Sequence, residues 1–300
     1  MKNNRNSILL FTVLLISMPA LTANANVVED YGVAIRGSIS ATTDYRERGL
    51  STTGNRPTVY GNVELLHRSG VFLNTEVRGI KREQFPGSDG YQVQLVGGFR
   101  WGDPDAWHFE VGSQYSLFPG AKQPGVESIE LIFDPDTGEV VDLIPKENFS
   151  SPNTTELYGT VKYNKLYLTL FHTVSDDNNG INSYVVCSSI EDIEASIDCI
   201  QDGIKHSKSS QYYEVGYTHI FNKKSSINIK GGIQKINNFE DFDVKNLTIE
   251  YLHKWHSVGL TLAAVLTDAK NSELYEVNFS QSDVRDTSKN TVTASINYTF

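Results

Sequence analysis

The last ten residues, 291–300, constrain the fold more than any other stretch of the chain. Val292, Ala294, Ile296, Tyr298 and Phe300 occupy every second position, which is the period of a β-strand, whose successive side chains face opposite sides. A helical stripe through the same stretch would collect only two apolar residues. The intervening positions are polar and uncharged, so one face of this strand could contact lipid and the other water. The alternative is an amphipathic edge strand of a soluble sandwich.

The same alternation recurs in eleven further segments between residues 33 and 266, and the first of them is expected to run from Val33 to Tyr45. Connections after even-numbered segments are short, and those after odd-numbered segments are longer. Aromatic residues stand at both ends of the segments 91–101 and 107–115, where amphipathic rings would meet two membrane interfaces. The sequence therefore predicts an all-β fold, a transmembrane antiparallel up-and-down β-barrel of about 12 strands.

The N-terminus has the pattern of a secretory signal peptide. Lys2 and Arg5 precede the apolar run 8–16, and Ala23 and Ala25 follow at the distance typical of signal-peptidase cleavage. We therefore expect a signal peptide over 1–25 and an outer-membrane barrel domain over 26–300. Removing Lys2 and Arg5 from the 26 basic residues leaves 24 against 36 acidic ones, a net charge of −12. This charge argues against nucleic acid as a partner.

Three long connections, 117–153, 175–210 and 268–290, are predicted to be extracellular loops. The first two are acidic and would draw cations to the mouth of a channel, or contact lipopolysaccharide through divalent cations. Cys187 and Cys199, the only cysteines, both lie in the second loop, and export to an oxidising compartment predicts that they form a disulfide.

If the apolar faces contact lipid, the other faces place charged side chains in the lumen. Such side chains could form a constriction that sorts ions and small solutes, or a ladder of ion pairs that stiffens the barrel. The candidates are Arg36, Asp44, Glu64, Glu76, Arg78, Arg100, Glu110, Glu156, Lys162, Glu214, Lys230, Glu250 and Lys254.

A motif at the end of the first predicted strand resembles a known family. The run Asp44-Tyr45-Arg46-Glu47-Arg48-Gly49-Leu50-Ser51 is similar to the signature of the TorF family of porin-like proteins, also catalogued as Gcw_chp, and the matching positions are Asp44, Tyr45, Arg46, Arg48, Gly49 and Ser51. The resemblance covers residues 33–115 and the C-terminal strand, whereas Glu47 stands where such proteins have an aromatic residue. It implies an outer-membrane barrel with an undefined solute, no catalytic residue, and a closing strand, ending in Phe300, that the barrel assembly machinery reads.

The expected function is passive diffusion of small hydrophilic solutes or ions, with a weak preference for cations. One alternative is a closed structural or adhesive barrel, which lumen-filling aromatic residues such as Tyr60, Phe72, Tyr158 and Tyr212 would favour. Another is a barrel lipid hydrolase or acyltransferase, but a barrel phospholipase needs His and Ser two positions apart on one lipid-facing strand. His172, His219 and His253 are instead followed at that spacing by Val174, Phe221 and Trp255. We therefore expect no enzyme activity, no cofactor and no metal site.

Overall fold

The computed structural model describes residues 32–103, 105–138, 140–188, 190 and 193–300. The predicted signal peptide, 1–25, lies outside these residues. Among the described residues, no helix combines the length and the apolar character needed to cross a membrane.

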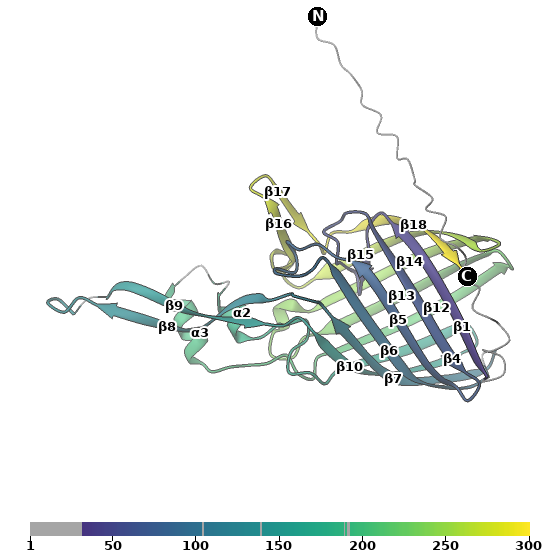
Figure 1. Cartoon of the computed structure of the whole chain (residues 1–300), viewed down its shortest axis with the longest axis horizontal. Helices are drawn as coiled ribbons and strands as arrows, with labels where there is room; N and C mark the ends of the chain where they lie inside the picture. Colours follow the sequence, from purple (N-terminus) through teal and green to yellow (C-terminus); the bar gives the residue numbers. More distant parts are fainter. Residues whose placement is uncertain (1–31, 104, 139, 189, 191–192) are drawn as a thin grey trace, which may run out of the picture.

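A closed barrel of twelve antiparallel strands forms the body of the molecule, as predicted (Figure 1). The last strand pairs with the first, Ile39 lying opposite Tyr298, and this pairing closes the ring. Closure leaves no unpaired edge. The barrel strands are β1 (Val33–Thr42), β4 (Thr58–His67), β5 (Val71–Gly79), β6 (Tyr91–Gly102), β7 (Trp107–Leu117), β10 (Thr154–Tyr163), β11 (Leu166–Thr173), β12 (Gln211–Asn222), β13 (Ser225–Lys235), β14 (Val244–Trp255), β15 (Val258–Ala269) and β18 (Thr291–Thr299).

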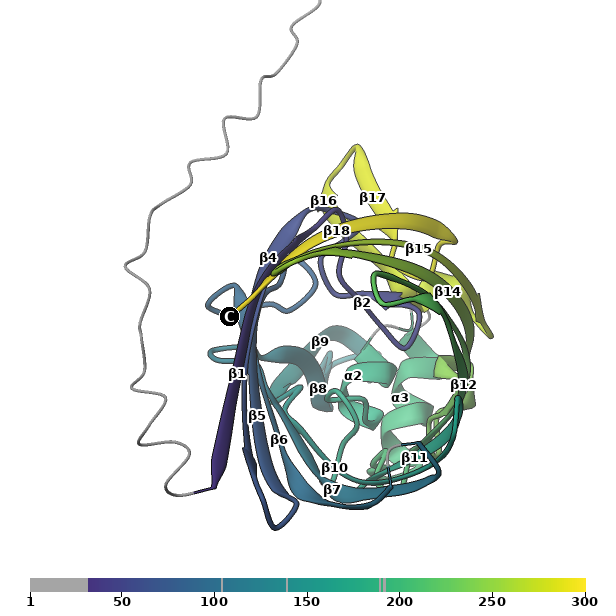
Figure 2. The same cartoon turned by 90° about the vertical axis from the view of Figure 1, so that its right-hand side faces the viewer.

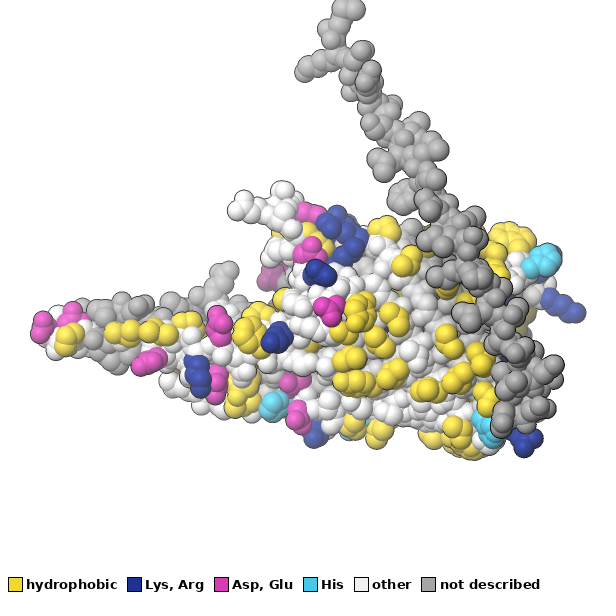
Figure 3. Space-filling view, in the orientation of Figure 1, with side chains coloured by type: hydrophobic (Ala, Val, Ile, Leu, Met, Phe, Trp, Pro, Cys, Tyr) yellow, Lys and Arg dark blue, Asp and Glu magenta, His cyan; other side chains and the backbone are white. Residues whose placement is uncertain are grey.

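The two faces of the strands differ as the alternation predicts. Outward side chains such as Val59, Leu168 and Val292 are 64%, 55% and 74% exposed, whereas the inward Phe72 and Tyr212 are 3% and 2% exposed. Figure 3 shows apolar side chains distributed over the visible outer wall of the barrel. Such an outer wall is unfavourable in water and suited to lipid.

Short and long connections alternate and lie at opposite ends of the barrel (Figure 1). The end with the short turns is called the turn end, and the other the loop end. The long connections hold β2 (Arg46–Glu47), β3 (Leu50–Ser51), β8 (Gln123–Phe133), β9 (Val140–Ser150), α2 (Ser183–Ser188), α3 (Ile193–Gln201), η1 (Glu240–Phe242), η2 (Ser272–Tyr275), β16 (Glu276–Ser280) and β17 (Asp283–Asp286). The short helices were not predicted, because two turns of helix carry little periodicity.

A long hairpin, β8–β9, projects from the loop end well beyond the barrel (Figure 1). At its tip the Gly138 N–H donates to the Asp134 carbonyl oxygen over 2.8 Å, which closes the turn. The pair α2 and α3 packs against the base of β8. Cys187 and Cys199 form the predicted disulfide between these two helices.

The first strand is shorter than predicted. β1 ends at Thr42 rather than Tyr45, because the Thr42 hydroxyl donates to the Asp44 carbonyl oxygen over 2.8 Å and turns the chain. Residues 43–57, called the lumen loop below, then fold into the barrel, where β2 lies within the ring of strands (Figure 2).

Candidate functional site

The carboxylate of Asp44 organises the lumen loop. It accepts hydrogen bonds from Ser51 Oγ at 2.6 Å, Thr53 Oγ1 at 2.7 Å and Arg46 Nε at 2.7 Å. Asp44, Ser51 and Thr53 are all nearly fully buried. A buried charge with several fixed partners is costly to disturb, so these contacts stabilise the observed shape of the loop.

Arg46 and Gly49 shape the tight turn between β2 and β3. The Arg46 guanidinium donates to the Gly49 carbonyl oxygen at 2.8 Å and to Asn55 Oδ1 at 2.7 Å. Gly49 has a φ of 88°, and a Cβ there would lie 2.7 Å from Asn246 Cβ on the barrel wall. Both the backbone conformation and the close approach require glycine.

Glu47 ties the loop to the wall formed by β5 and β6. Its carboxylate accepts from Arg78 Nη2 at 2.8 Å and from Gln94 Nε2 at 3.3 Å. Arg78 is 1% exposed, and its guanidinium carbon lies 4.4 Å from the centroid of the Tyr45 ring. The Tyr45 hydroxyl donates in turn to Glu76 at 2.7 Å. Charge pairing and stacking therefore hold this side of the loop.

Arg48, the next residue, reaches the opposite wall. Its guanidinium donates twice to Glu156, at 2.6 and 2.9 Å, and once to Gln234 Oε1 at 2.8 Å. Its carbon also lies 4.8 Å from the centroid of Phe171 and 4.6 Å from that of Tyr212. These partners lie on β10, β11, β12 and β13, so adjacent residues of one loop are tied to opposite walls. The loop thus crosses the lumen (Figure 2).

Two cavities lie on either side of this crossing. The outer cavity, toward the loop end, has a volume of about 210 Å³ and is lined by Glu47, Arg48, Gln84 and Gln234 among others. The inner cavity, of about 390 Å³, is lined by Asp44, Arg48, Glu76, Glu214, Lys230 and Glu250 among others. Arg48 lines both cavities. Its side chain therefore stands at the boundary between them.

Most of the remaining predicted lumen charges form pairs along the walls. Arg100 bridges Glu64, at 2.5 Å, and Glu110. Arg36 lies 3.9 Å from Glu64 and is mostly exposed. Four further contacts join Lys230 to Glu250, Tyr158 to Glu110, and both Tyr167 and Tyr212 to Glu214. Lys162 and Lys254 form no ion pair with any described residue.

The predicted candidates thus fall into two groups. Asp44, Glu76, Arg78 and Glu156 contact the lumen loop or belong to it, whereas the others lie along the walls. Glu47, Gln94, Gln234 and Phe171 were missed. Nothing in their sequence positions distinguishes them, since they become neighbours only after the loop turns inward. The motif 44–51 is the one sequence signal that marks this loop, since it contains Asp44, Arg46 and Arg48.

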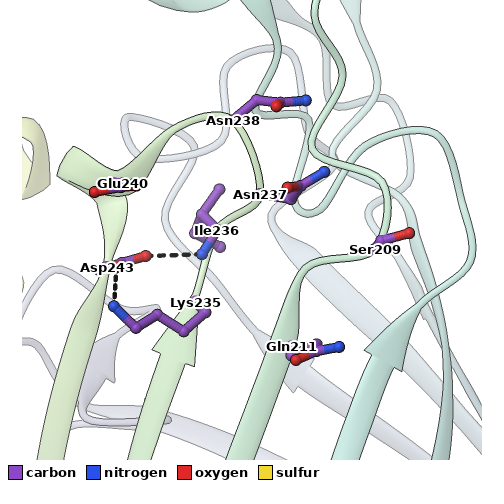
Figure 4. A pocket seen from close by; sticks show the side chains of 8 residues that line it. All are labelled: Ser209, Gln211, Lys235, Ile236, Asn237, Asn238, Glu240 and Asp243. Carbon is purple, nitrogen blue, oxygen red and sulfur yellow. Dashed lines mark hydrogen bonds and ion pairs between the residues drawn. The ribbon is translucent and has the colours of Figure 1, made fainter.

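A third polar hollow lies at the rim of the loop end and is called the rim groove. Figure 4 shows its eight lining side chains, Ser209, Gln211, Lys235, Ile236, Asn237, Asn238, Glu240 and Asp243. Asp243 accepts from Lys235 Nζ at 2.5 Å and from the Ile236 N–H at 2.8 Å. The charges of Lys235 and Asp243 therefore compensate each other. The lumen loop contributes no residue to the rim groove.

One Ser–His contact bears on the enzyme alternative. Ser225 Oγ and His253 Nδ1 lie 2.8 Å apart on the adjacent strands β13 and β14. A hydrolytic triad also needs a carboxylate that orients the histidine, and no described carboxylate bonds to His253. Within the described ranges, no cluster of three His, Cys, Asp or Glu side chains could hold a metal ion.

Comparison with solved structures finds other barrels at low similarity. The KdgM porin is 10% identical with a TM-score of 0.44, over 89% of this chain and 99% of that one. The NanC porin is 9% identical with a TM-score of 0.45, also over 89% and 99%. A FadL homologue from Pseudomonas aeruginosa is 9% identical with a TM-score of 0.43, over 90% of both chains. At these values the likeness carries no argument about function.

No curated protein sequence matches this chain. The model of a bacterial protein family of unknown function, Gcw_chp, matches residues 28–300. That range contains the whole barrel, the lumen loop and the aromatic C-terminus. The chain therefore belongs to the Gcw_chp family.

Proposed function

We propose that this protein is an outer-membrane channel for small hydrophilic solutes or ions, with its narrowest point at Arg48. The observation that carries the proposal is the position of this side chain between two cavities inside a closed barrel. A barrel of this size has room for a narrow path only. The lumen loop therefore limits passage to small species.

The proposed location of the channel is the bacterial outer membrane. The protein would reach it after export directed by the N-terminal signal peptide. Support comes from the apolar outer wall and from the contacting aromatic residues Trp101, Phe109, Trp107 and Tyr163 near the turn end. The turn end would face the periplasm, and the loop end the outer leaflet with its lipopolysaccharide. Phe300 closes the barrel through reciprocal backbone hydrogen bonds with Gly37, at 2.9 and 3.0 Å. This strand is the proposed signal for the barrel assembly machinery.

The weak cation preference remains part of the proposal. The inner cavity is lined by four carboxylates, Asp44, Glu76, Glu214 and Glu250, against three cations, Arg46, Arg48 and Lys230, so the constriction itself is nearly balanced. The preference would arise from the acidic loops at the mouth, whose potential is screened over about 10 Å at 0.1 M salt. Selectivity for K⁺ over Cl⁻ should therefore fade as the salt concentration rises.

Planar-bilayer conductance tests the channel. The wild-type protein is expected to give small, uniform current steps, and Arg48→Ala larger ones, because the substitution removes the side chain between the two cavities. Arg36→Ala is the matched control, since Arg36 is mostly exposed at the turn end, and it should leave the step size unchanged. Steps that are equal in wild type and Arg48→Ala would contradict the position of the constriction.

A closed structural or adhesive barrel is the second candidate. Two observations favour it: the buried aromatic residues Phe72, Tyr158 and Tyr212 fill part of the lumen, and the β8–β9 hairpin projects far beyond the barrel. The same measurement separates the candidates. A folded protein that gives no steps, with or without Arg48, would favour the closed barrel.

A further inference from the structure

The outer wall of strands β12, β13 and β14 changes character near the turn end. Along most of these strands the outward side chains are apolar or tyrosine, and Val215 and Leu247 are exposed examples. At the turn end, the same alternation places His219, Ser225 and His253 on the outer wall. Polar side chains are costly where a wall faces hydrocarbon. This polar group therefore needs a polar partner outside the barrel.

Two aromatic side chains indicate the depth of this polar group in a bilayer. The ring centroids of Phe221 and His219 lie 4.8 Å apart, and those of Trp255 and His253 lie 4.2 Å apart. Phe221 and Trp255 are both exposed on the outer wall, and aromatic girdles of membrane barrels lie at the depth of the lipid headgroups. The histidines beside them are thus level with headgroups rather than with acyl chains.

The turns next to the polar group are cationic. The stretches 217–228 and 251–261 contain three lysines and three histidines but no Asp or Glu, although the whole chain carries a net charge of −10. Lys223 and Lys224, both exposed, form the turn between β12 and β13. The Lys254 N–H donates to the Lys224 carbonyl oxygen at 2.8 Å, which places this turn beside β14. Figure 3 shows Lys, Arg and His side chains at the turn end of the visible face.

The contact between Ser225 and His253 fixes the direction of the imidazole. Ser225 Oγ lies 2.8 Å from His253 Nδ1, and the Tyr251 hydroxyl donates to the same Oγ at 3.4 Å. Ser225 is buried, so it positions the ring and does not itself reach a ligand. Because Nδ1 is occupied, the other ring nitrogen, Nε2, is the one available to a molecule outside the wall.

An anionic phospholipid has the matching chemistry. Its phosphodiester carries a negative charge and only acceptor oxygens toward two ammonium groups, which are pure donors. A zwitterionic headgroup brings an ammonium of its own, which the same lysines would repel. The acyl chains would continue along the apolar outer wall, past residues such as Ile229 and Leu247. The ligand is a phospholipid rather than lipopolysaccharide, because the turn end is the end proposed to face the periplasm.

We propose that His219, Lys223, Lys224, Ser225 and His253, together called the turn-end patch, form a binding site for the headgroup of an anionic phospholipid. In this site the two lysines and His253 Nε2 contact the phosphate, and Ser225 is a positioning residue. The inference rests on the proposed location of the protein in the outer membrane. It does not depend on whether the barrel conducts, so it can be measured separately.

The test is native mass spectrometry of the folded, detergent-solubilised protein with an equimolar mixture of phosphatidylglycerol and phosphatidylcholine that have the same acyl chains. The wild-type protein should retain phosphatidylglycerol about tenfold more than phosphatidylcholine, because two lysines favour the net negative headgroup. Equal retention of the two lipids, or preferential retention of phosphatidylcholine, would overturn the proposal.

A double lysine variant locates the site on the turn. Lys223→Gln combined with Lys224→Gln should weaken binding of phosphatidylglycerol by about fivefold for each lysine removed. Arg36→Gln combined with Arg68→Gln is the matched control, because it removes two exposed cations from the same end of the barrel. Equal losses in the two double variants would show a diffuse electrostatic attraction and contradict a site at the turn-end patch.

A histidine variant locates the site on the wall. His253→Phe keeps an aromatic ring beside Trp255 and removes Nε2, and it should weaken binding by about fivefold, the equivalent of one hydrogen bond. His172→Phe is its control, because His172 lies near the loop end of β11. Unchanged binding in both the double lysine variant and His253→Phe would overturn the proposal.

Failure of this inference and failure of the channel are distinguishable. A preference for phosphatidylglycerol without bilayer current steps would support the lipid site and contradict the channel. Current steps without such a preference would do the opposite. If a variant does not fold, as judged by heat-modifiable migration on gels, the comparison of the two lipids on the wild-type protein still decides the proposal.

Discussion

The lumen loop and the β8–β9 hairpin are both antiparallel turns inserted at the loop end, yet one folds into the barrel and the other projects away from it. In the lumen loop, charged side chains find buried partners on two walls, as Glu47 does with Arg78 and Arg48 with Glu156. In the hairpin, the one ion pair among described residues, Lys146 with Glu127 at 3.0 Å, is largely exposed. Hairpin geometry alone does not decide the direction. The partners available to the side chains do.

A third hairpin, β16–β17, strengthens the contrast because it holds the lumen loop from outside. Arg56 pairs with Asp283 at 2.6 Å, and Asn55 Nδ2 donates to the Asp286 carbonyl oxygen at 2.9 Å. Arg56 also lies over the Phe279 ring, 3.9 Å from its centroid. The lumen loop is thus held by two walls of the barrel and by the β16–β17 hairpin, whereas β8–β9 is held at its base only.

The largest expected effect comes from Asp44→Ala. The substitution leaves the buried Arg46 without its carboxylate partner, and breaking a buried ion pair typically costs about 3–5 kcal/mol. The transition temperature of the heat-modifiable gel shift should fall, and the conductance should become larger and less uniform because the lumen loop loses its fixed shape. Asp134→Asn, at the tip of β8–β9, is the control and should change neither quantity. Equal effects of the two substitutions would contradict the expected difference between the lumen loop and the β8–β9 hairpin.

Removing the disulfide should affect the projecting region and leave the barrel lumen unchanged. In the chain-entropy model, a crosslink that spans a sequence separation of 12 contributes about 3 kcal/mol. The double variant Cys187→Ser and Cys199→Ser should therefore make residues 183–201 more susceptible to limited proteolysis. Its single-channel conductance should equal that of the wild type. A changed conductance would show that the helical pair and the lumen loop are coupled.

A smaller, pH-dependent effect is expected where β16–β17 holds the lumen loop. Hydrogen bonds from Arg285, first, and then Arg56 lower the pKa of Asp283 from its ordinary value of 3.8. Because the folded-state pKa is depressed, these contacts stabilise the folded chain fully above the ordinary value, and the stabilisation is lost as the pH falls through the lowered one. Amide exchange of residues 283–286 should therefore rise below about pH 4, after correction for the intrinsic exchange rate.

Asp283→Asn is the control for this prediction. The variant should show the faster corrected exchange already at pH 7, with no further change on acidification. If wild type and variant respond to acid alike, another group controls the attachment of the hairpin.

The barrel could be predicted from the sequence because its determinants are local. Each strand must show apolar side chains to one side and polar ones to the other, so the period of two is visible in every segment, from Val33 to Phe300. The alternation of short and long connections orders the strands, and closure follows from the need to pair every edge. The disulfide could be predicted equally well, since the chain has only two cysteines.

The candidate site was only partly predictable. The alternation assigned Glu156 and Arg78 to the lumen, and the family motif included Arg48, but nothing local connects residues that lie 108 positions apart, as Arg48 and Glu156 do. Their pairing exists only because closure of the barrel brings β10 opposite the connection between β1 and β4, and because Asp44 turns that connection inward. The hydrogen bonds of Gln84 with Ser51 and of Gln234 with Arg48 follow from the same turn, because Ser51 and Arg48 belong to the lumen loop. The sequence by itself determined the wall of this barrel through local periodicity, and the tertiary structure decided what crosses its interior, because contacts between distant residues depend on the closed ring.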